Sequence, residues 1–344
     1  MPWQPVFFLL QPRARDRTAE VRVTVSIAIP VLALVLLGQT HMIIYAAFGA
    51  FTALYGRGSR SCVRLHAQLA AAALIVIGAG TGVLLAATAA PFVCVLVVET
   101  AYAAVGSLWA DRASLNPRGP FFGIFALGAC ASVAPSGPPL YAAAIAAGTA
   151  TLALAVTSID AYMRRARDPR DASDMPVRLA PFGHGARHAI EYALVVFAAG
   201  VAGYLLGWGH SYWAMASAAV PLAAADLPGR IGRGLHRIVG TLVGLVVTAA
   251  ILVWAPPPGL LAIIVIALMP PTEALMSRHY AAALVFFTPM ILVMTQLASP
   301  VPRSQLIIDR AAETALGAVI GMLVVCAISG AEALLRRSMA RARE

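Results

Sequence analysis

Apolar residues follow one another in long runs along most of this chain, and short polar stretches separate the runs. A helix needs about 20 apolar residues to cross a hydrocarbon layer of ~30 Å, and most of the runs approach this length. The pattern predicts an all-α polytopic membrane protein with about 12 transmembrane helices. The predicted segments cover roughly residues 21–38, 40–56, 64–88, 91–109, 119–135, 139–162, 186–207, 210–225, 235–255, 258–272, 279–297 and 306–334.

Composition supports this class and excludes others. Of 344 residues, 60% are hydrophobic and 12% are charged, whereas soluble domains carry about 25% charged residues. The formal charge of +10 comes from arginines in short loops, without a basic patch interleaved with aromatic residues. Nucleic acid is therefore not an expected partner. The lipid bilayer is the expected partner.

The arginines also predict an orientation. If the N-terminus is cytoplasmic, every arginine except Arg303 and Arg310 falls on the cytoplasmic side, as the positive-inside rule requires. We therefore expect a multi-pass protein of the cell membrane, inner or plasma, with both termini in the cytoplasm.

The predicted segments fall into two halves of six. We expect a cytoplasmic tail over 1–20, a first six-helix repeat over 21–163, a linker rich in Arg, Asp and Pro over 164–185, a second repeat over 186–335 and a tail over 336–344. Six is an even number of crossings, so the two repeats should run parallel to each other.

Charged residues recur at similar positions in both halves. Arginines with i, i+3 and i+7 spacing recur 173 positions later, and Glu99 has a counterpart 174 positions later in Glu273. On a helix this arginine spacing places all three side chains on one face. The two triplets are Arg57, Arg60, Arg64 and Arg230, Arg233, Arg237.

Segments two and eight are short, at about 15 residues each, and begin near His41 and His210. Such a helix spans about 22 Å, which is less than the hydrocarbon core. Paired short segments in corresponding positions often mark the substrate path of a transporter. A tilt of neighbouring helices or a locally thin bilayer is the alternative explanation.

Four sequence blocks resemble the fusaric acid resistance protein-like (FUSC) family. The similarity covers residues 185–335 well and residues 20–165 only through the predicted repeat. The blocks are His210-Ser211-Tyr212-Trp213-Ala214, Arg233 to Gly244, Arg278-His279-Tyr280-Ala281-Ala282-Ala283 with Phe287-Thr288-Pro289, and Arg310-Ala311-Ala312-Glu313-Thr314.

This resemblance implies a function. The family includes aromatic acid exporters and is similar to plant aluminium-activated malate channels, so it implies export of organic anions, expected to be aromatic carboxylates. It also implies a homodimer. Longer family members carry a large cytosolic domain between their halves, and the linker here has about twenty residues, which leaves any regulation by such a domain open.

The arginines are the first candidates for binding the anion, because a guanidinium group matches a carboxylate in a bidentate fork. Both triplets are expected to form a ring at the cytoplasmic mouth, with Arg64 and Arg237 deepest. Arginines that set topology and contact anionic lipid are the alternative.

Glu99 is a carboxylate within a membrane segment and is the candidate for proton coupling. Glu273 is expected near the cytoplasmic mouth, and His41 and His210 at the outer ends of the short segments, as substrate groups or interfacial anchors. Arg310 and Glu313 are expected to form an ion pair within one helix near the outer surface.

Cofactors and metals are not expected. The four cysteines form no CxxC pair, and the chain contains no Walker motif or metal-ligand cluster, nor a nucleophile–base arrangement of an enzyme. An exporter of organic anions, with proton coupling as a hypothesis, is the main interpretation. A passive anion channel and a membrane accessory or scaffold protein are the alternatives.

Overall fold

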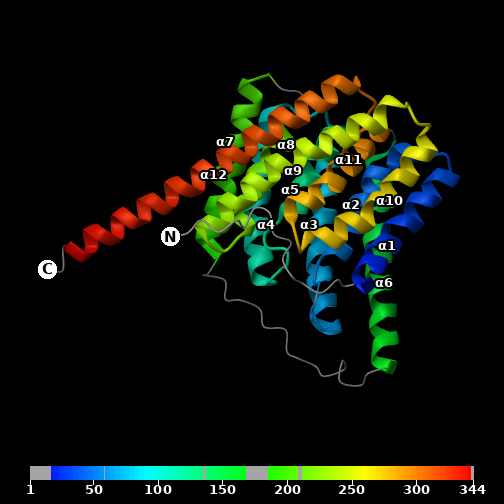
Figure 1. Cartoon of the computed structure of the whole chain (residues 1–344), viewed down its shortest axis with the longest axis horizontal. Coiled ribbons are helices and arrows are strands. Elements are labelled where there is room, and N and C mark those ends of the chain that lie inside the picture. Colours follow the sequence, from blue (N-terminus) through cyan, green and yellow to red (C-terminus); the bar gives the residue numbers. More distant parts are fainter. Residues whose placement is uncertain (1–16, 58, 135–136, 168–184, 208–210, 342–344) are drawn as a thin grey trace.

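The computed structural model describes residues 17–57, 59–134, 137–167, 185–207 and 211–341, and every regular element within these ranges is a helix (Figure 1). The α-helices are α1 (Arg17–Leu36), α2 (Ile43–Ala50), α3 (Ser61–Ala87), α4 (Phe92–Arg112), α5 (Phe121–Ala131), α6 (Pro139–Arg167), α7 (Ala186–Leu205), α8 (Tyr212–Ala219), α9 (Leu227–Val253), α10 (Pro258–Met276), α11 (Tyr280–Ala298) and α12 (Arg303–Arg341).

Nine of the helices in the described part of the chain are long and apolar enough to cross a membrane. The other three, α2, α5 and α8, are shorter. Segments two and eight are short as predicted, because 3-10 turns at Phe51–Leu54 and Pro221–Ala223 end them. Segment five, predicted over 119–135, is an 11-residue helix that starts after Pro120. The all-helical prediction is confirmed.

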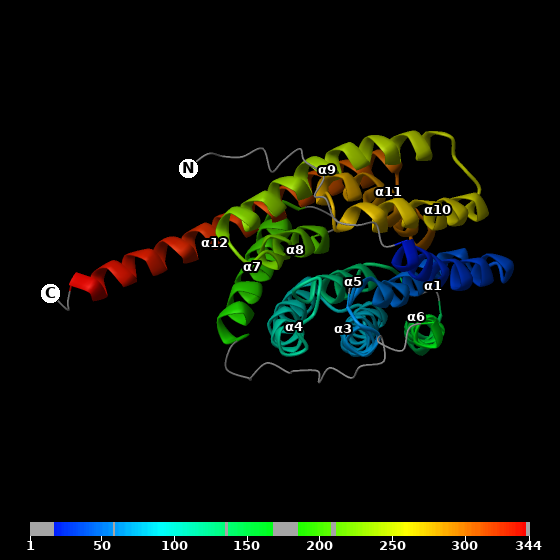
Figure 2. The ribbon, with the colours of Figure 1, turned by 60° about the horizontal axis from the view of Figure 1, so that its bottom comes forward.

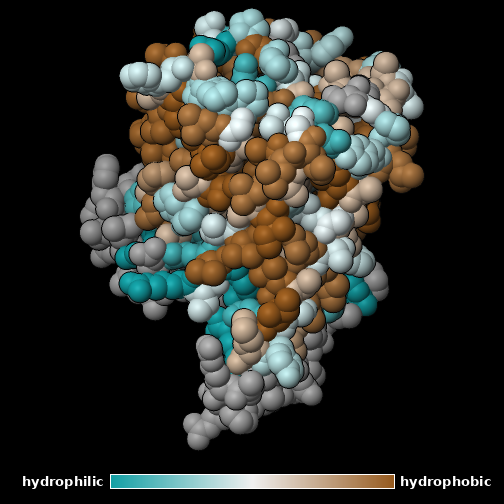
Figure 3. All heavy atoms as spheres, turned by 90° about the vertical axis from the view of Figure 1, so that its right-hand side faces the viewer, coloured by the Kyte–Doolittle hydropathy of each residue, from teal (hydrophilic) through white to brown (hydrophobic). Residues whose placement is uncertain are grey.

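The outer surface is that of a membrane protein. Large apolar side chains point outward from several long helices, among them Leu36, Leu140, Val246 and Trp254, each more than two-thirds exposed. Figure 3 shows hydrophobic residues spread over the centre of one face, with the most hydrophilic residues at its lower left and paler ones across its top. An apolar surface of this extent is covered by lipid rather than water.

Successive helices alternate in direction between two ends of the bundle. We call one of them the arginine-rich end, formed by the loops 55–60, 113–120, 224–226 and 277–279. Ion pairs at this end join α1 to α6 through Arg22 and Asp160, and α9 to α7 through Arg230 and Glu191. The ends of these helices therefore lie on the same side of the molecule.

Helices of the two halves pack in the same order. In the first half α3 packs on α5 and α6 while α2 packs on α6; in the second, α9 packs on α11 and α12 while α8 packs on α12. Across the halves, α4 packs on α7 and α10 on α1, and the short helices α8 and α2 contact α5 and α11 (Figure 2). The short helices thus lie between the halves, and every residue of α2 and α8 is buried.

The arginine triplets do not occupy equivalent positions. The bounds of α3 and α9 differ by 166 positions at both ends, from 61 to 227 and from 87 to 253, not by 173. Seven residues are two helical turns, which preserves the face but shifts the side chains by about 10 Å along the axis. Arg57 and Arg60 precede α3, whose N-cap is Arg60, whereas Arg230 and Arg233 lie within α9.

The predicted correspondence of Glu99 and Glu273 fails for the same reason. Glu99 is the eighth residue of α4 and Glu273 the sixteenth of α10, so they lie at different depths. Two predicted boundaries also move. Helix α6 continues to Arg167, into the predicted linker, and α12 continues to Arg341, through most of the predicted tail; residues 168–184 of the linker lie outside the described residues.

Small residues let the short helices approach their neighbours closely. A Cβ atom on Gly317 or Gly321 of α12 would overlap the carbonyl oxygen of Ala214 or Ala218 on α8, and one on Gly49 of α2 would overlap that of Ala146 on α6. Backbone-to-backbone contact of this kind is how helices associate inside a membrane. These glycines therefore hold the buried short helices in place.

We expect Gly317→Ala to lower the free energy of unfolding by about 2 kcal/mol, because the added methyl group meets a backbone oxygen that cannot move aside. The thermal midpoint Tm in detergent measures the change. Gly330→Ala on the same helix is the control, since nothing lies within 4 Å of its Cβ position. Equal midpoints of the two variants would contradict this account of the α8–α12 contact.

Candidate anion-binding site

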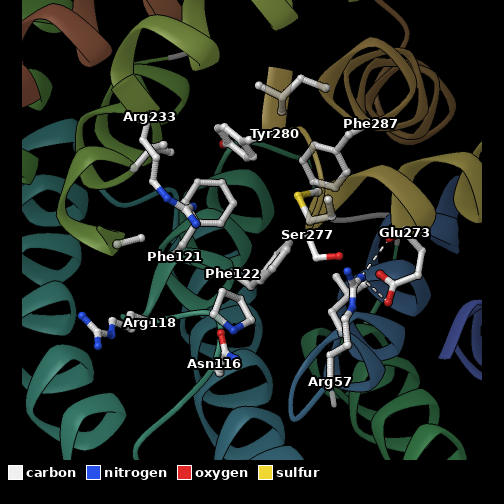
Figure 4. Close-up of a pocket in the computed structure, with 16 residues that line it drawn as sticks. Arg57, Asn116, Arg118, Phe121, Phe122, Arg233, Glu273, Ser277, Tyr280 and Phe287 are labelled. Atoms are coloured by element: carbon white, nitrogen blue, oxygen red, sulfur yellow. Dashed lines mark hydrogen bonds and ion pairs between the residues drawn. The ribbon is translucent and has the colours of Figure 1, made fainter. Parts of the chain in front are cut away.

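A cavity of about 420 Å³ opens at the arginine-rich end, between the two halves of the chain. We call it the outer cavity, because it lies nearer to the arginine-rich end of the bundle than the buried Arg237 does. Its walls come from the loops before α3 and α5, from the first turn of α5, and from α9, α10 and α11 (Figure 4). The lining residues used below are Arg57, Arg118, Phe121, Phe122, Arg233, Glu273, Tyr280 and Phe287.

Three arginines contribute charge to the outer cavity, and each has a different environment. Arg57 forms an ion pair with Glu273 and donates a second hydrogen bond of 3.0 Å to its backbone oxygen. The guanidinium carbon of Arg233 lies 5.4 Å from the centre of the Tyr280 ring, and Arg118 is exposed. With one carboxylate against three guanidinium groups, the lining carries net positive charge, which attracts anions.

Aromatic rings form the apolar part of the same wall. Phe122 lies 5.1 Å from Phe121 and 6.3 Å from Phe287, measured between ring centres. Figure 4 shows Arg233 beside Phe121 on one side and the Arg57–Glu273 pair on the other. A cavity with rings and cations together suits an anion that carries an aromatic or other apolar group.

Arg237 lies deeper than the outer cavity and is fully buried. Its Nε donates a 3.3 Å hydrogen bond to Ser217 Oγ, and its guanidinium carbon lies 5.4 Å from the centre of the Phe121 ring. Phe121 therefore separates Arg237 from the outer cavity, which it also lines. Arg310, expected near the outer surface, is fully buried as well, as is Glu313.

Burial changes the environment of Arg310, which was predicted to form an ion pair with Glu313. The three guanidinium nitrogens of Arg310 have no hydrogen-bond partner among the described residues. The guanidinium lies over aromatic rings instead, 5.0 Å from the centre of Trp213 and 5.8 Å from that of Phe125. The i, i+3 spacing places both residues on one side of α12, but the side chain of Arg310 points to α8 and α5.

Arg64 does not join Arg237. Its guanidinium group reaches Asp160 of α6 at 3.5 Å, and Asp160 also binds Arg22 at 3.0 Å and Arg164 at 3.1 Å. Both Arg22 and Arg64 are almost completely buried. This cluster fastens α1, α3 and α6 together. Arg60 is exposed and lies outside the lining of the outer cavity.

Arg230 lies in a comparable cluster of the second half. It binds Glu191 at 2.9 Å, and Glu191 also binds Arg187, at 2.8 Å. These residues line a second cavity of about 400 Å³, together with a His188–Asp111 pair at 2.8 Å. Arg118 lines this cavity as well, but the other charged groups here are paired with each other, so this cavity offers an anion less than the outer cavity does.

Glu99 is fully buried in α4, as expected for a carboxylate within the membrane. Both of its carboxylate oxygens are without a hydrogen-bond partner in the described part of the chain. They face Gly128 of α5, where an added Cβ atom would lie 3.0 and 3.1 Å from them. Glu99 of α4 thus packs against α5, the helix that carries Phe121.

Of the two histidines predicted as substrate groups or interfacial anchors, the structure describes one, His41, which does not line the outer cavity. His41 is half-buried in the 3-10 turn Thr40–Met42 that precedes α2, and His210 lies outside the described residues. Of the predicted residues, the outer cavity brings together Arg57, Arg233 and Glu273. It adds Arg118, which the sequence presents as a topology signal, Tyr280, which it presents as a core residue, and the rings of Phe121 and Phe122, which no sequence pattern marked. Among the described residues, no group of His, Cys, Asp and Glu could hold a metal ion.

Comparison with known proteins gives a partial match. Residues 197–324 match the family described as fusaric acid resistance protein-like, so the resemblance based on the sequence blocks is confirmed there. An uncharacterised membrane protein, YvaC, of Bacillus subtilis (strain 168) is 32% identical over 136 residues, which are 39% of this chain and 22% of that protein. The chain thus matches about a fifth of that relative's length. No solved structure matches.

We expect Asp160→Asn to lower the free energy of unfolding by about 3 kcal/mol, because it leaves two buried guanidinium groups without their carboxylate. Arg164→Gln is the control, since Arg164 is 35% exposed at its side chain and its loss should cost less than about 1 kcal/mol. Thermal unfolding in detergent compares the two. If both variants unfold at the same temperature, Asp160 does not fasten α1, α3 and α6.

Proposed function

We propose that this chain, which carries the fusaric acid resistance protein-like domain over residues 197–324, is a membrane transporter that exports organic anions with an aromatic part. The single observation that carries this proposal is the composition of the outer cavity. It combines net positive charge with a wall of aromatic rings, and it lies between two halves that pack in the same helix order. Aromatic carboxylates have the chemistry that complements such a wall.

A transporter accounts for the inner end of the outer cavity better than a channel does. An open pore needs a continuous polar passage, but Phe121, Phe122 and Phe287 line the cavity, and Arg237 beside Phe121 is outside the lining and fully buried. A closed inner end fits alternating access, in which a rearrangement of one half against the other opens the far side. In this proposal the two halves are parallel six-helix repeats.

The orientation of the proposed transport follows from the arginines. Loops rich in arginine stay in the cytoplasm, so the outer cavity faces the cytoplasm, both termini lie there, and the anion leaves the cell. The net positive lining of the outer cavity would raise the local concentration of the anion before export. A homodimer in the cell membrane is part of the proposal through the family.

Reconstitution into liposomes tests the function. We expect liposomes containing the protein to release radiolabelled benzenesulfonate, which keeps its charge at every working pH, faster than protein-free liposomes do. Methanesulfonate, which lacks the ring, should leave more slowly by a factor of about ten, since burying the ring contributes more than 1.4 kcal/mol. Equal rates with and without protein would reject transport, and a current through a voltage-clamped bilayer would favour a channel.

We expect Arg233→Gln to raise the benzenesulfonate concentration for half-maximal transport about tenfold, because a charge-assisted contact in the outer cavity is lost. Arg278→Gln is the matched control, since it removes the same charge at the same end of the molecule but Arg278 does not line the cavity. An equal effect of both variants would show that the general positive field, not the cavity, recruits the anion.

Glu99 supports a further part of the proposal, which is that transport is coupled to protons. A buried carboxylate without a hydrogen-bond partner in the described region is stable only when it is protonated or when a charge arrives beside it. We expect Glu99→Gln to abolish the acceleration of uptake into inverted vesicles by a pH gradient, while uptake without a gradient continues. An unchanged response to the gradient would exclude Glu99 as the proton carrier.

A further inference from the structure

Two guanidinium groups lie in the interior of this protein beyond the outer cavity. Arg237 on α9 and Arg310 on α12 are both fully buried. Five of their nitrogens are without a hydrogen-bond partner among the described residues: Nη1 and Nη2 of Arg237, and Nε, Nη1 and Nη2 of Arg310. Each of these atoms is a buried hydrogen-bond donor without an acceptor in the described part of the chain.

The two groups lie along one helix. The guanidinium of Arg237 lies over Phe121 and that of Arg310 over Phe125, and the two rings, one turn apart on α5, have their centres 6.0 Å from each other. Both cations therefore lie over rings on successive turns of α5. Like charges that approach each other in a medium of low polarity repel strongly, so an anion placed between them would be attracted by both.

Neither of these two arginine side chains is exposed at the surface of the protein. Arg237 is the eleventh residue of α9, about 15 Å from the arginine-rich end, and Arg310 is the eighth residue of α12, about 10 Å from the opposite end. Arginines near a helix end extend along the helix to reach water. These two instead lie in the interior, where their side chains have zero exposure.

The nearby polar groups satisfy only a part of this charge. Ser217 Oγ accepts one hydrogen bond from Arg237 Nε. Glu313 attracts Arg310 electrostatically, yet the nitrogens of Arg310 donate no hydrogen bond to it. The aromatic rings stabilise a cation through their faces but accept no in-plane hydrogen bonds. The guanidinium edges thus remain available to an oxyanion.

We infer that Arg237 and Arg310 form an inner anion-binding site, which takes the carboxylate or sulfonate group of the transported anion after it leaves the outer cavity. This inference rests on the proposed function and adds a second binding position to it. Two forked donors offer enough N–H groups for the two oxygens of a carboxylate or the three oxygens of a sulfonate. Phe121, which lines the outer cavity on one side and lies under Arg237 on the other, separates the two sites.

The effect of a substitution on the Tm separates an arginine that binds a ligand from one that holds the fold together. An arginine that holds helices together stabilises the fold, as Arg64 does through Asp160. An arginine that serves a ligand is a buried charge whose hydrogen-bond donors have no acceptor in the fold. Replacing it by an apolar side chain of similar volume removes this unfavourable free energy and stabilises the protein. Arg310→Met and Arg237→Met should therefore raise the Tm in detergent, whereas Arg64→Met should lower it.

Transport gives the second measurement. We expect Arg310→Met and Arg237→Met to lower the maximal rate of benzenesulfonate release from liposomes at least tenfold, and Arg310→Lys, which keeps the charge, to recover part of that rate. Arg233→Gln, in the outer cavity, should alter the half-maximal concentration instead. Wild-type transport together with an undiminished rate of either Met variant would overturn the inner site and leave the proposed function standing. A Tm that falls in both Met variants, without recovery in Arg310→Lys, would overturn it as well.

A wild-type protein that releases no anion would instead contradict the proposed function. In that case the change in Tm on adding benzenesulfonate tests whether the inner site binds an anion. A rise in Tm of the wild type and of Arg233→Gln, but not of Arg310→Met, would support an anion site that is not used for transport. A rise of the same size in all three proteins would overturn the inner site.

Discussion

Burying a guanidinium group in an apolar helical bundle is unfavourable unless a partner is buried with it, and this constraint divides the arginines of the chain into two classes. Arg22, Arg64 and Arg230 meet Asp160 or Glu191 and thereby fasten helices that are distant in sequence. Arg237 and Arg310 meet aromatic faces instead. The first class is paired within the fold, and the second keeps hydrogen-bond donors that have no acceptor among the residues the structure describes.

The short helices make this arrangement possible. Because α8 has eight residues and its neighbour α12 carries glycine at the contact, Trp213 and Ser217 reach the interior, where Arg310 and Arg237 contact them. A helix of full length with larger residues would fill that space with apolar side chains. The close backbone contact therefore determines both the packing and the position of the buried charges.

Sequence reasoning reached the fold class, most helix positions and the short segments, since hydrophobic run length is a direct physical requirement of a bilayer. It failed on register. A periodic pattern of arginines matches itself equally well after a shift of seven residues, because two helical turns restore the same face. Only the helix bounds in the structure separate these alternatives, because α3 and α9 begin and end 166 positions apart. Arg57, Arg233 and Glu273 were reached from the sequence, but the rings of Phe121 and Phe122 were not, because aromatic residues in an apolar run have no signature that separates core from cavity.

Arg310 shows most clearly why a residue pair in sequence does not define an interaction. Spacing of three residues from Glu313 is compatible with an ion pair on a helix surface, where water separates the pair from all other groups. Inside a bundle the neighbouring helices compete for the same side chain. Here α5 and α8 present Phe125 and Trp213, whose faces attract the cation without consuming its hydrogen-bond donors. A cation held in this way keeps its position and its capacity to bind, which is the combination that a site for a passing anion requires.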